Sequence, residues 1–222
     1  MSKSKSKSLS QSRSDFNFDL VVLSGAVTFP SMAGLRSAQE PLILPGFTWE
    51  QYQAVAESFS GSGVSVRFLD EVMELRAPVS EEHEERRSLL RRLVESWCFH
   101  RGIRLFFRNQ STMLLPGEAG GAPDEAYCIG EKKELPDLVV EVALTSGGLS
   151  HRGFYQRFAI PELWIWRHGV LEVFCWDGAA GRYEASAESH TLPDLDLRLV
   201  AECARMHNAS DALAVFRKRI GA

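Results

Sequence analysis

The hydrophobic positions of this chain change their spacing several times, and these changes outline the elements of secondary structure. From residue 138 to residue 144 nearly every side chain is apolar, which is typical of a strand covered on both faces. A Gly-rich turn at 147–148, a short helix and a second apolar run ending at Trp166 follow. The pattern therefore predicts two buried strands joined by a turn and a helix.

Residues 47–52 carry the pattern of a helix N-terminus. Thr48 and Gln51 have the spacing of a capping box, and Phe47 with Tyr52 supplies the apolar contact that accompanies such a start. These residues predict a helix over about 49–59.

A hairpin and a long helix are predicted next. Strands are expected at 64–68 and 72–77, with a tight turn around Asp70 and Glu71. Ser80 then caps a helix over about 81–100. The buried stripe of that helix has helical spacing and consists of Leu90, Leu93, Val94 and Trp97.

Toward its N-terminus the same stripe turns polar. It meets Arg86 and then His83, with Glu82 at its edge. A helix face with this pattern is expected where one end of the helix borders a functional site. The alternative is that the first turns of the helix extend into solvent.

The remaining segments complete an α+β plan. Strands are expected at 103–108, 111–115, 122–129, 170–176 and 183–185, with a Gly-rich loop at 116–121 and helices at 195–206 and 210–220. Strands that arrive mostly as hairpins, with helices between and after them, predict a mixed β-sheet flanked by helices.

Composition narrows the class of protein. The 222 residues are 45% hydrophobic and 24% charged, and the net charge of −4 argues against a general binder of polyanions. Four scattered cysteines without a CxxC pair predict reduced, buried thiols in a cytoplasmic protein. The longest apolar runs are well short of the roughly 18 residues that a membrane span requires.

The chain is expected to have three parts. Residues 1–15 form a Ser/Lys tract that is too polar to fold, 16–46 form an N-terminal arm, and 47–222 form the main domain. The apolar segment 20–29 follows positive charges, as in a signal peptide, so secretion is an alternative. Asp15 and Asp19, which interrupt the approach to this segment, favour a strand or a docked arm.

Two carboxylates stand out as candidates for chemistry. Glu141 interrupts a buried strand, where an unpaired charge costs several kcal/mol. Asp124 follows Pro123 at the start of the preceding strand, which a short loop could make the antiparallel neighbour. Two adjacent carboxylates stay ionised when a cation lies between them, and oxygen ligands favour Mg²⁺ or Mn²⁺. Metal-assisted hydrolysis is the reaction class that these residues indicate.

The chain from about Phe47 to Trp176 resembles the Uma-type restriction endonuclease family of the PD-(D/E)XK nuclease superfamily. The matching pieces are APVSEEHEERRSLL, APDEAYCI, LPDLVVEVALTSGG and FYQRFAIPELWIW, in this order. The resemblance implies a restriction-endonuclease-like fold, DNA as substrate and a homodimer. It implies that Asp124 and Glu141 hold the metal together with the Val142 carbonyl, and that His83 belongs to the site.

One departure from the family pattern concerns the motif lysine. The family places it on the helix after the glutamate, one turn before a tyrosine; here Tyr155 is present but His151 occupies the lysine position. No lysine lies between Lys133 and Lys218. Histidine can position water or act as a base, but it lacks a permanent charge, and losses of this kind cost about 10²–10⁴ in rate.

Each candidate residue also has a structural interpretation. Asp124 is then a turn residue at the strand entry, Glu141 a partner of an arginine such as Arg86, and His151 a helix-capping or surface histidine. Asp137 is interpreted as structural. Seven arginines between 86 and 108 are either a solvated helix face or an edge that faces DNA.

Three functions remain open on the sequence alone. The first is a metal-dependent DNA endonuclease, impaired to the extent that His151 fails to replace lysine. The second is a catalytically inactive nuclease-fold protein that binds nucleic acid or a protein partner. The third is a metal-dependent hydrolase with another substrate.

Overall fold

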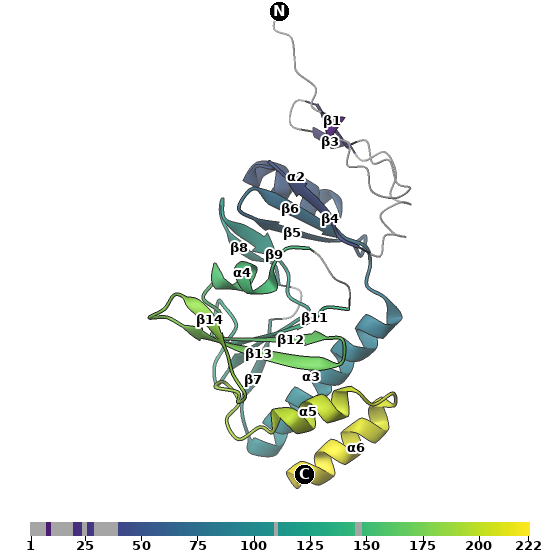
Figure 1. Ribbon diagram of the computed structural model, residues 1–222, viewed down its shortest axis with the longest axis vertical. Helices are drawn as coiled ribbons and strands as arrows, with labels where there is room; N and C mark the ends of the chain where they lie inside the picture. Colours follow the sequence, from purple (N-terminus) through teal and green to yellow (C-terminus); the bar gives the residue numbers. More distant parts are fainter. Residues whose placement is uncertain (1–7, 10–19, 24–25, 29–39, 109–110, 145–147) are drawn as a thin grey trace, which may run out of the picture. The chain divides into compact units, whose positions relative to one another are not determined.

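The structure is a computed structural model, and it describes residues 8–9, 20–23, 26–28, 40–108, 111–144 and 148–222 (Figure 1). Most of the predicted tail at 1–15 and much of the arm at 16–46 therefore lie outside the described residues. Within these parts, β1 (Ser8–Leu9), β2 (Leu20–Leu23) and β3 (Ala26–Thr28) form an antiparallel sheet. The chain divides into two compact units.

The first unit contains the predicted hairpin and the helix before it. Four strands pair in the order β4-β6-β5-β9, and their bounds are β4 (Leu42–Pro45), β5 (Ser65–Leu69), β6 (Val72–Arg76) and β9 (Ala119–Gly121). Asp70 and Glu71 both have positive φ, which makes the tight turn that the sequence predicts. Helix α2 (Trp49–Ser58) has the complete capping box of Thr48 and Gln51, so that prediction is confirmed.

Strand β9 corrects the expectation of an irregular Gly-rich loop at 116–121. Gly120 pairs with Phe68 of β5, and Ala119 pairs with Leu69. The pairing depends on the missing side chain, because a Cβ at Gly120 would lie only 2.5 Å from Cε1 of Tyr52. The glycines therefore allow a strand to lie against an aromatic ring, a context that composition alone does not reveal.

The second unit is built on a mixed sheet of order β14-β13-β12-β11-β10-β7. Its strands are β7 (Leu105–Phe107), β10 (Glu125–Ile129), β11 (Leu138–Val142), β12 (Glu162–Arg167), β13 (Val170–Asp177) and β14 (Arg182–Ala185). Strands β11 and β12 are parallel and the other neighbours antiparallel. The short strand β8 (Met113–Leu115) also belongs to this unit.

Helices cover both faces of this sheet (Figure 1). Helices α3 (Glu81–Arg101), α5 (Leu197–Ala204) and α6 (Ala209–Ile220) lie on one face, and α4 (His151–Gln156) lies on the other. The predicted stripe of α3 packs with Val140 and Trp164 in the main core. The α+β class and the mixed sheet flanked by helices are therefore confirmed.

All four cysteines are free and buried, as expected from their scatter along the chain. Among the residues that the structure describes, no helix is long and apolar enough to cross a bilayer.

Candidate functional site

The site is positioned by the pairing of β10 with β11. These strands are antiparallel, and Glu125 stands opposite Val140. The next pair in this register is Asp124 and Glu141, as the sequence predicts for neighbouring strands. The backbone N–H of Val142 donates a hydrogen bond of 2.8 Å to Oδ2 of Asp124, so the aspartate is held against the residue that follows Glu141.

Glu141 lies on the face of the sheet that α4 covers. Successive side chains of β11 alternate between faces, and its neighbours Val140 and Val142 belong to the core beneath α3. The hydroxyl of Tyr155 donates to Oε1 of Glu141, and Nε2 of His151 lies 3.3 Å from Oε2. Both partners come from α4, where residues four apart share a face.

The position of His151 excludes its interpretation as a surface or helix-capping histidine. Its side chain is 8% exposed and faces Glu141, so it is not a surface histidine. The N-cap of α4 is Ser150, whose side chain accepts from the N–H of Gly153, so His151 is not the cap either. The histidine at the family's lysine position is thus a direct neighbour of the candidate metal ligand.

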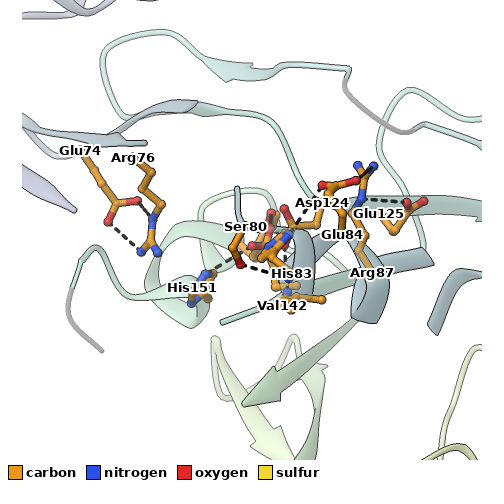
Figure 2. A network of polar contacts seen from close by, with 12 residues as sticks. Glu74, Arg76, Ser80, His83, Glu84, Arg87, Asp124, Glu125, Val142 and His151 are labelled. Atoms are coloured by element: carbon orange, nitrogen blue, oxygen red, sulfur yellow. Dashed lines mark hydrogen bonds and ion pairs between the residues drawn. The ribbon is translucent and has the colours of Figure 1, made fainter. Parts of the chain in front are cut away.

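His83 is brought to the same place by the first turn of α3. Ser80 caps this helix by accepting from the N–H of His83, and Nε2 of His83 lies 3.2 Å from Oδ2 of Asp124 (Figure 2). Burial of the ring lowers its pKa. The hydrogen bond to Asp124 and the charges of Asp124, Glu84 and Glu141 outweigh this effect, so the pKa of His83 is raised above its ordinary value.

Arg86 and Asp137 have structural roles. Nη1 of Arg86 donates to the carbonyl oxygens of Ala204 and Met206 at 2.7 and 2.8 Å, which satisfies the C-terminal end of α5. Arg86 is therefore not the salt-bridge partner that was considered for Glu141. Asp137 accepts from Lys133 and from the N–H of Ile129, as expected for a structural residue.

Most of the arginine-rich segment is engaged within the molecule. Arg91 pairs with Glu95, Arg101 pairs with Asp194, and Arg108 donates to the carbonyl of Glu134. Arg104 lies over the ring of Phe106. These contacts favour the interpretation of the arginines as a charged helix face. They count against the alternative of an edge that faces DNA.

Sequence reasoning missed the pair formed by Arg87 and Glu125. Nε of Arg87 lies 3.7 Å from Oε1 of Glu125, and Nη2 donates to Glu84 at 2.6 Å (Figure 2). The available signal was the spacing of Arg87, four residues after His83, which puts both on one helix face.

The donor set fits a hard divalent cation of low protein coordination. Among the described residues, no group of three or more His, Cys, Asp or Glu side chains is arranged to hold a metal. The site instead offers the carboxylates of Asp124 and Glu141. Each carboxylate oxygen has two lone pairs, so those that accept hydrogen bonds can still bind a cation. Mg²⁺ characteristically binds through one or two carboxylates and keeps several waters.

Comparisons with known proteins establish the family of the chain. The model of the Uma2 family, described as "Putative restriction endonuclease", matches residues 49–204. A crystal structure described as that of a putative nuclease belonging to DUF820, from Anabaena variabilis, is similar with 14% identity and a TM-score of 0.40, over 68% of this chain and 90% of that chain. No curated protein matches this chain. Since the family model spans well over half of the sequence, the chain belongs to the Uma2 family of restriction endonuclease-like proteins.

Proposed function

We propose that this protein is a Mg²⁺- or Mn²⁺-dependent endonuclease that hydrolyses phosphodiester bonds in DNA. The observation that carries the proposal is a pair of carboxylates, Glu141 on β11 and Asp124 directly before β10. Asp124 accepts from the N–H of Val142, and a histidine lies against each carboxylate. Family membership supports the substrate class. In this proposal Asp124, Glu141 and the Val142 carbonyl hold the cation, which supplies a polarised water and offsets charge on the phosphate.

The residues around the carboxylates prepare them for this role. The Tyr155 hydroxyl and the His151 ring each contact one oxygen of Glu141, which is 2% exposed. These contacts offset the unfavourable free energy of burying a charged group. The Val142 N–H and the His83 ring do the same for Asp124. Oxygens held in place in this way can present their remaining lone pairs to a cation.

The histidines have distinct proposed roles. His151 replaces the lysine of the family pattern and lies close enough to Glu141 to take or return a proton near the cation. His83 orients Asp124 through the contact of its Nε2 with Oδ2 of that residue. Removing a general base or a positioned charge of this kind lowers rates by about 10²–10⁴.

A cleavage assay on supercoiled plasmid tests the proposal. Wild-type protein is incubated with Mg²⁺, Mn²⁺ or Ca²⁺, and nicked and linear products are followed over time. We expect cleavage with Mg²⁺ and Mn²⁺, and its loss in Asp124→Asn and in Glu141→Gln. Glu184→Gln, which alters an exposed carboxylate on β14, is the matched control and should cleave normally. Metal-independent cleavage, or full activity in either site variant, contradicts the proposal.

The second candidate is a nuclease-fold protein that binds DNA without cleaving it. The absence of lysine between residues 133 and 218 favours it, because the second half of the site then has no ammonium group. It predicts retained DNA binding whose affinity falls steeply with salt, and no cleavage with any metal. Binding measured at several salt concentrations beside the plasmid assay separates the two candidates.

A further inference from the structure

We propose that the ion pair between Arg87 and Glu125 positions His83 against Asp124. This inference rests on the endonuclease function proposed above, because it adds two residues to the support of that site. It assigns neither residue to contact with substrate or metal.

Two residues of α3 contact two consecutive residues at the start of β10. His83 and Arg87 are four residues apart and share one face of the helix. They meet consecutive residues of the strand region: Nε2 of His83 lies 3.2 Å from Asp124, and Nε of Arg87 lies 3.7 Å from Glu125. A shift of α3 along the strand would therefore break both contacts together.

The carboxylate of the second contact is buried more deeply than that of the first. Glu125 is 1% exposed, and its side chain shares a face with Val140, its partner across the strands, in the core beneath α3. A buried carboxylate requires a cationic or hydrogen-bonding partner, whereas Asp124, whose side chain is 20% exposed, also reaches solvent. Arg87 therefore pairs with a deeply buried residue, and His83 lies one turn earlier on the same helix.

The Arg87 guanidinium is also tied to the first turn of the helix. Its Nη2 donates to Oε2 of Glu84, which is adjacent to His83, and Oε1 of the same glutamate lies 3.7 Å from Nδ1 of His83 (Figure 2). Arg87 therefore links Glu125 to the segment that bears the histidine. A guanidinium suits this role because its fork of donors can serve two carboxylates at once.

Epistasis distinguishes positioning from general stabilisation. Cleavage is measured for Arg87→Gln, alone and in a His83→Ala background, at a temperature where thermal unfolding shows every variant folded. We expect Arg87→Gln to lower kcat by about 10²-fold with little change in KM, as misplacement of a site group by roughly 1 Å does. In the His83→Ala background it should cause no further loss. An equal loss in both backgrounds overturns the proposal.

Two further variants keep this test decisive. Arg87→Lys retains a cation and should recover part of the rate, and recovery no better than in Arg87→Gln counts against the proposal. If Arg87→Gln alone fails to fold, the double variant Arg87→Gln/Glu125→Gln, which removes the charge of both members of the pair, takes its place in the test. The control is Arg182→Gln, which breaks an exposed pair on β14 and should leave kcat unchanged.

A spectroscopic readout tests the same contact without cleavage. Long-range ¹H–¹⁵N spectra of the full-length protein report the hydrogen bonding of each histidine ring, and the His83 signals are identified by their loss in His83→Ala. In Arg87→Gln these signals should move toward those seen in Asp124→Asn, whereas Arg182→Gln should not move them. Unchanged signals overturn the positioning role. A shift in a protein that never cleaves DNA would refute the endonuclease function and leave the positioning role standing.

Discussion

The hydroxyl group of Tyr155 donates a hydrogen bond to Oε1 of Glu141, and both side chains are buried. This contact joins α4 to the central strand β11 at the one charged position of that strand. Together with the His151 contact it satisfies both oxygens of the carboxylate, which explains how a glutamate is accommodated among Val139, Val140 and Val142.

The first prediction is that Tyr155→Phe destabilises the protein by about 1.5–3 kcal/mol, the range for hydrogen bonds to charged groups. The ring is retained, so packing changes little. Tyr183→Phe is the matched control, because Tyr183 donates to the neutral carbonyl of Ile160, and it should cost about 0.5–1.5 kcal/mol. Urea unfolding measures both. Equal losses of stability in the two variants would contradict a hydrogen bond from Tyr155 to a charged carboxylate.

The second prediction concerns the site histidine. We expect His151→Lys to raise the cleavage rate at least about tenfold, because an ammonium group would place a permanent charge beside Glu141. Plasmid cleavage under single-turnover conditions measures the change. A fall in rate would instead show that a neutral imidazole is required as the base at this position.

The third prediction concerns Glu162, a buried carboxylate with a purely structural role. Its Oε1 accepts from Trp164 and Ser189, and its Oε2 accepts from the N–H groups of His190 and Thr191. Glu162→Gln turns an amide N–H₂ group toward these donors and leaves some of them unsatisfied. We therefore expect a loss of about 1–3 kcal/mol in the free energy of unfolding. Glu184→Gln, which affects an exposed pair, should cost no more than about 1 kcal/mol. A loss below about 1 kcal/mol for Glu162→Gln would contradict this role.

The fourth prediction concerns Gly148 in the first unit. This residue has φ +91, and a Cβ here would overlap Oε2 of Glu74 and Nη2 of Arg76. Those atoms form a partly buried ion pair, and Oε2 of Glu74 also accepts from the N–H of Leu149 at 2.6 Å. We expect Gly148→Ala to cost about 3 kcal/mol or more, since it adds disruption of this pair to backbone strain.

Gly46→Ala is the control for that substitution. Gly46 has φ +78, but a Cβ added there would meet no other side chain or backbone atom within 4 Å, so the variant should lose only the about 1–2 kcal/mol of left-handed strain. Urea unfolding compares the two variants. Equal costs would mean that the contacts of Glu74 and Arg76 contribute nothing at Gly148.

The fifth prediction concerns the thiols. Burial, with a smaller contribution from Glu95, raises the pKa of Cys98 to about 12, and burial also raises the pKa of Cys175 and Cys203. These thiols are therefore protonated and shielded at neutral pH, so reaction with Ellman's reagent should be very slow in the native protein. In denaturant all four cysteines should react. Rapid native labelling would show that the core opens readily.

Some features of the fold could be predicted because their signals are local. The capping box of α2, the Ser80 cap and buried stripe of α3, and the apolar run of β11 all match the structure. Caps and periodicity act over a few residues, so they are visible in a single sequence. The placement of Asp124 opposite Glu141 was also accessible, since a short connection makes consecutive strands neighbours.

Other features depended on segments far apart in the chain. Strand β9 exists because Gly120 fits against Tyr52, and Glu162 is satisfied by residues 189–191. Arg86 and Arg87 are adjacent, yet one serves the end of α5 and the other serves Glu125. A rotation of about 100° per residue separates their directions, and only the packed neighbours determine which one meets an acid.

Local patterning was thus enough to predict helices α2 and α3, strand β11 and the candidate carboxylates Asp124 and Glu141, because hydrophobic spacing and caps are short-range properties. The partners of those carboxylates were specified only on folding. His83, His151 and Tyr155 lie on two different helices, and they converge because α3 and α4 pack against opposite faces of one sheet beside the same pair of strands.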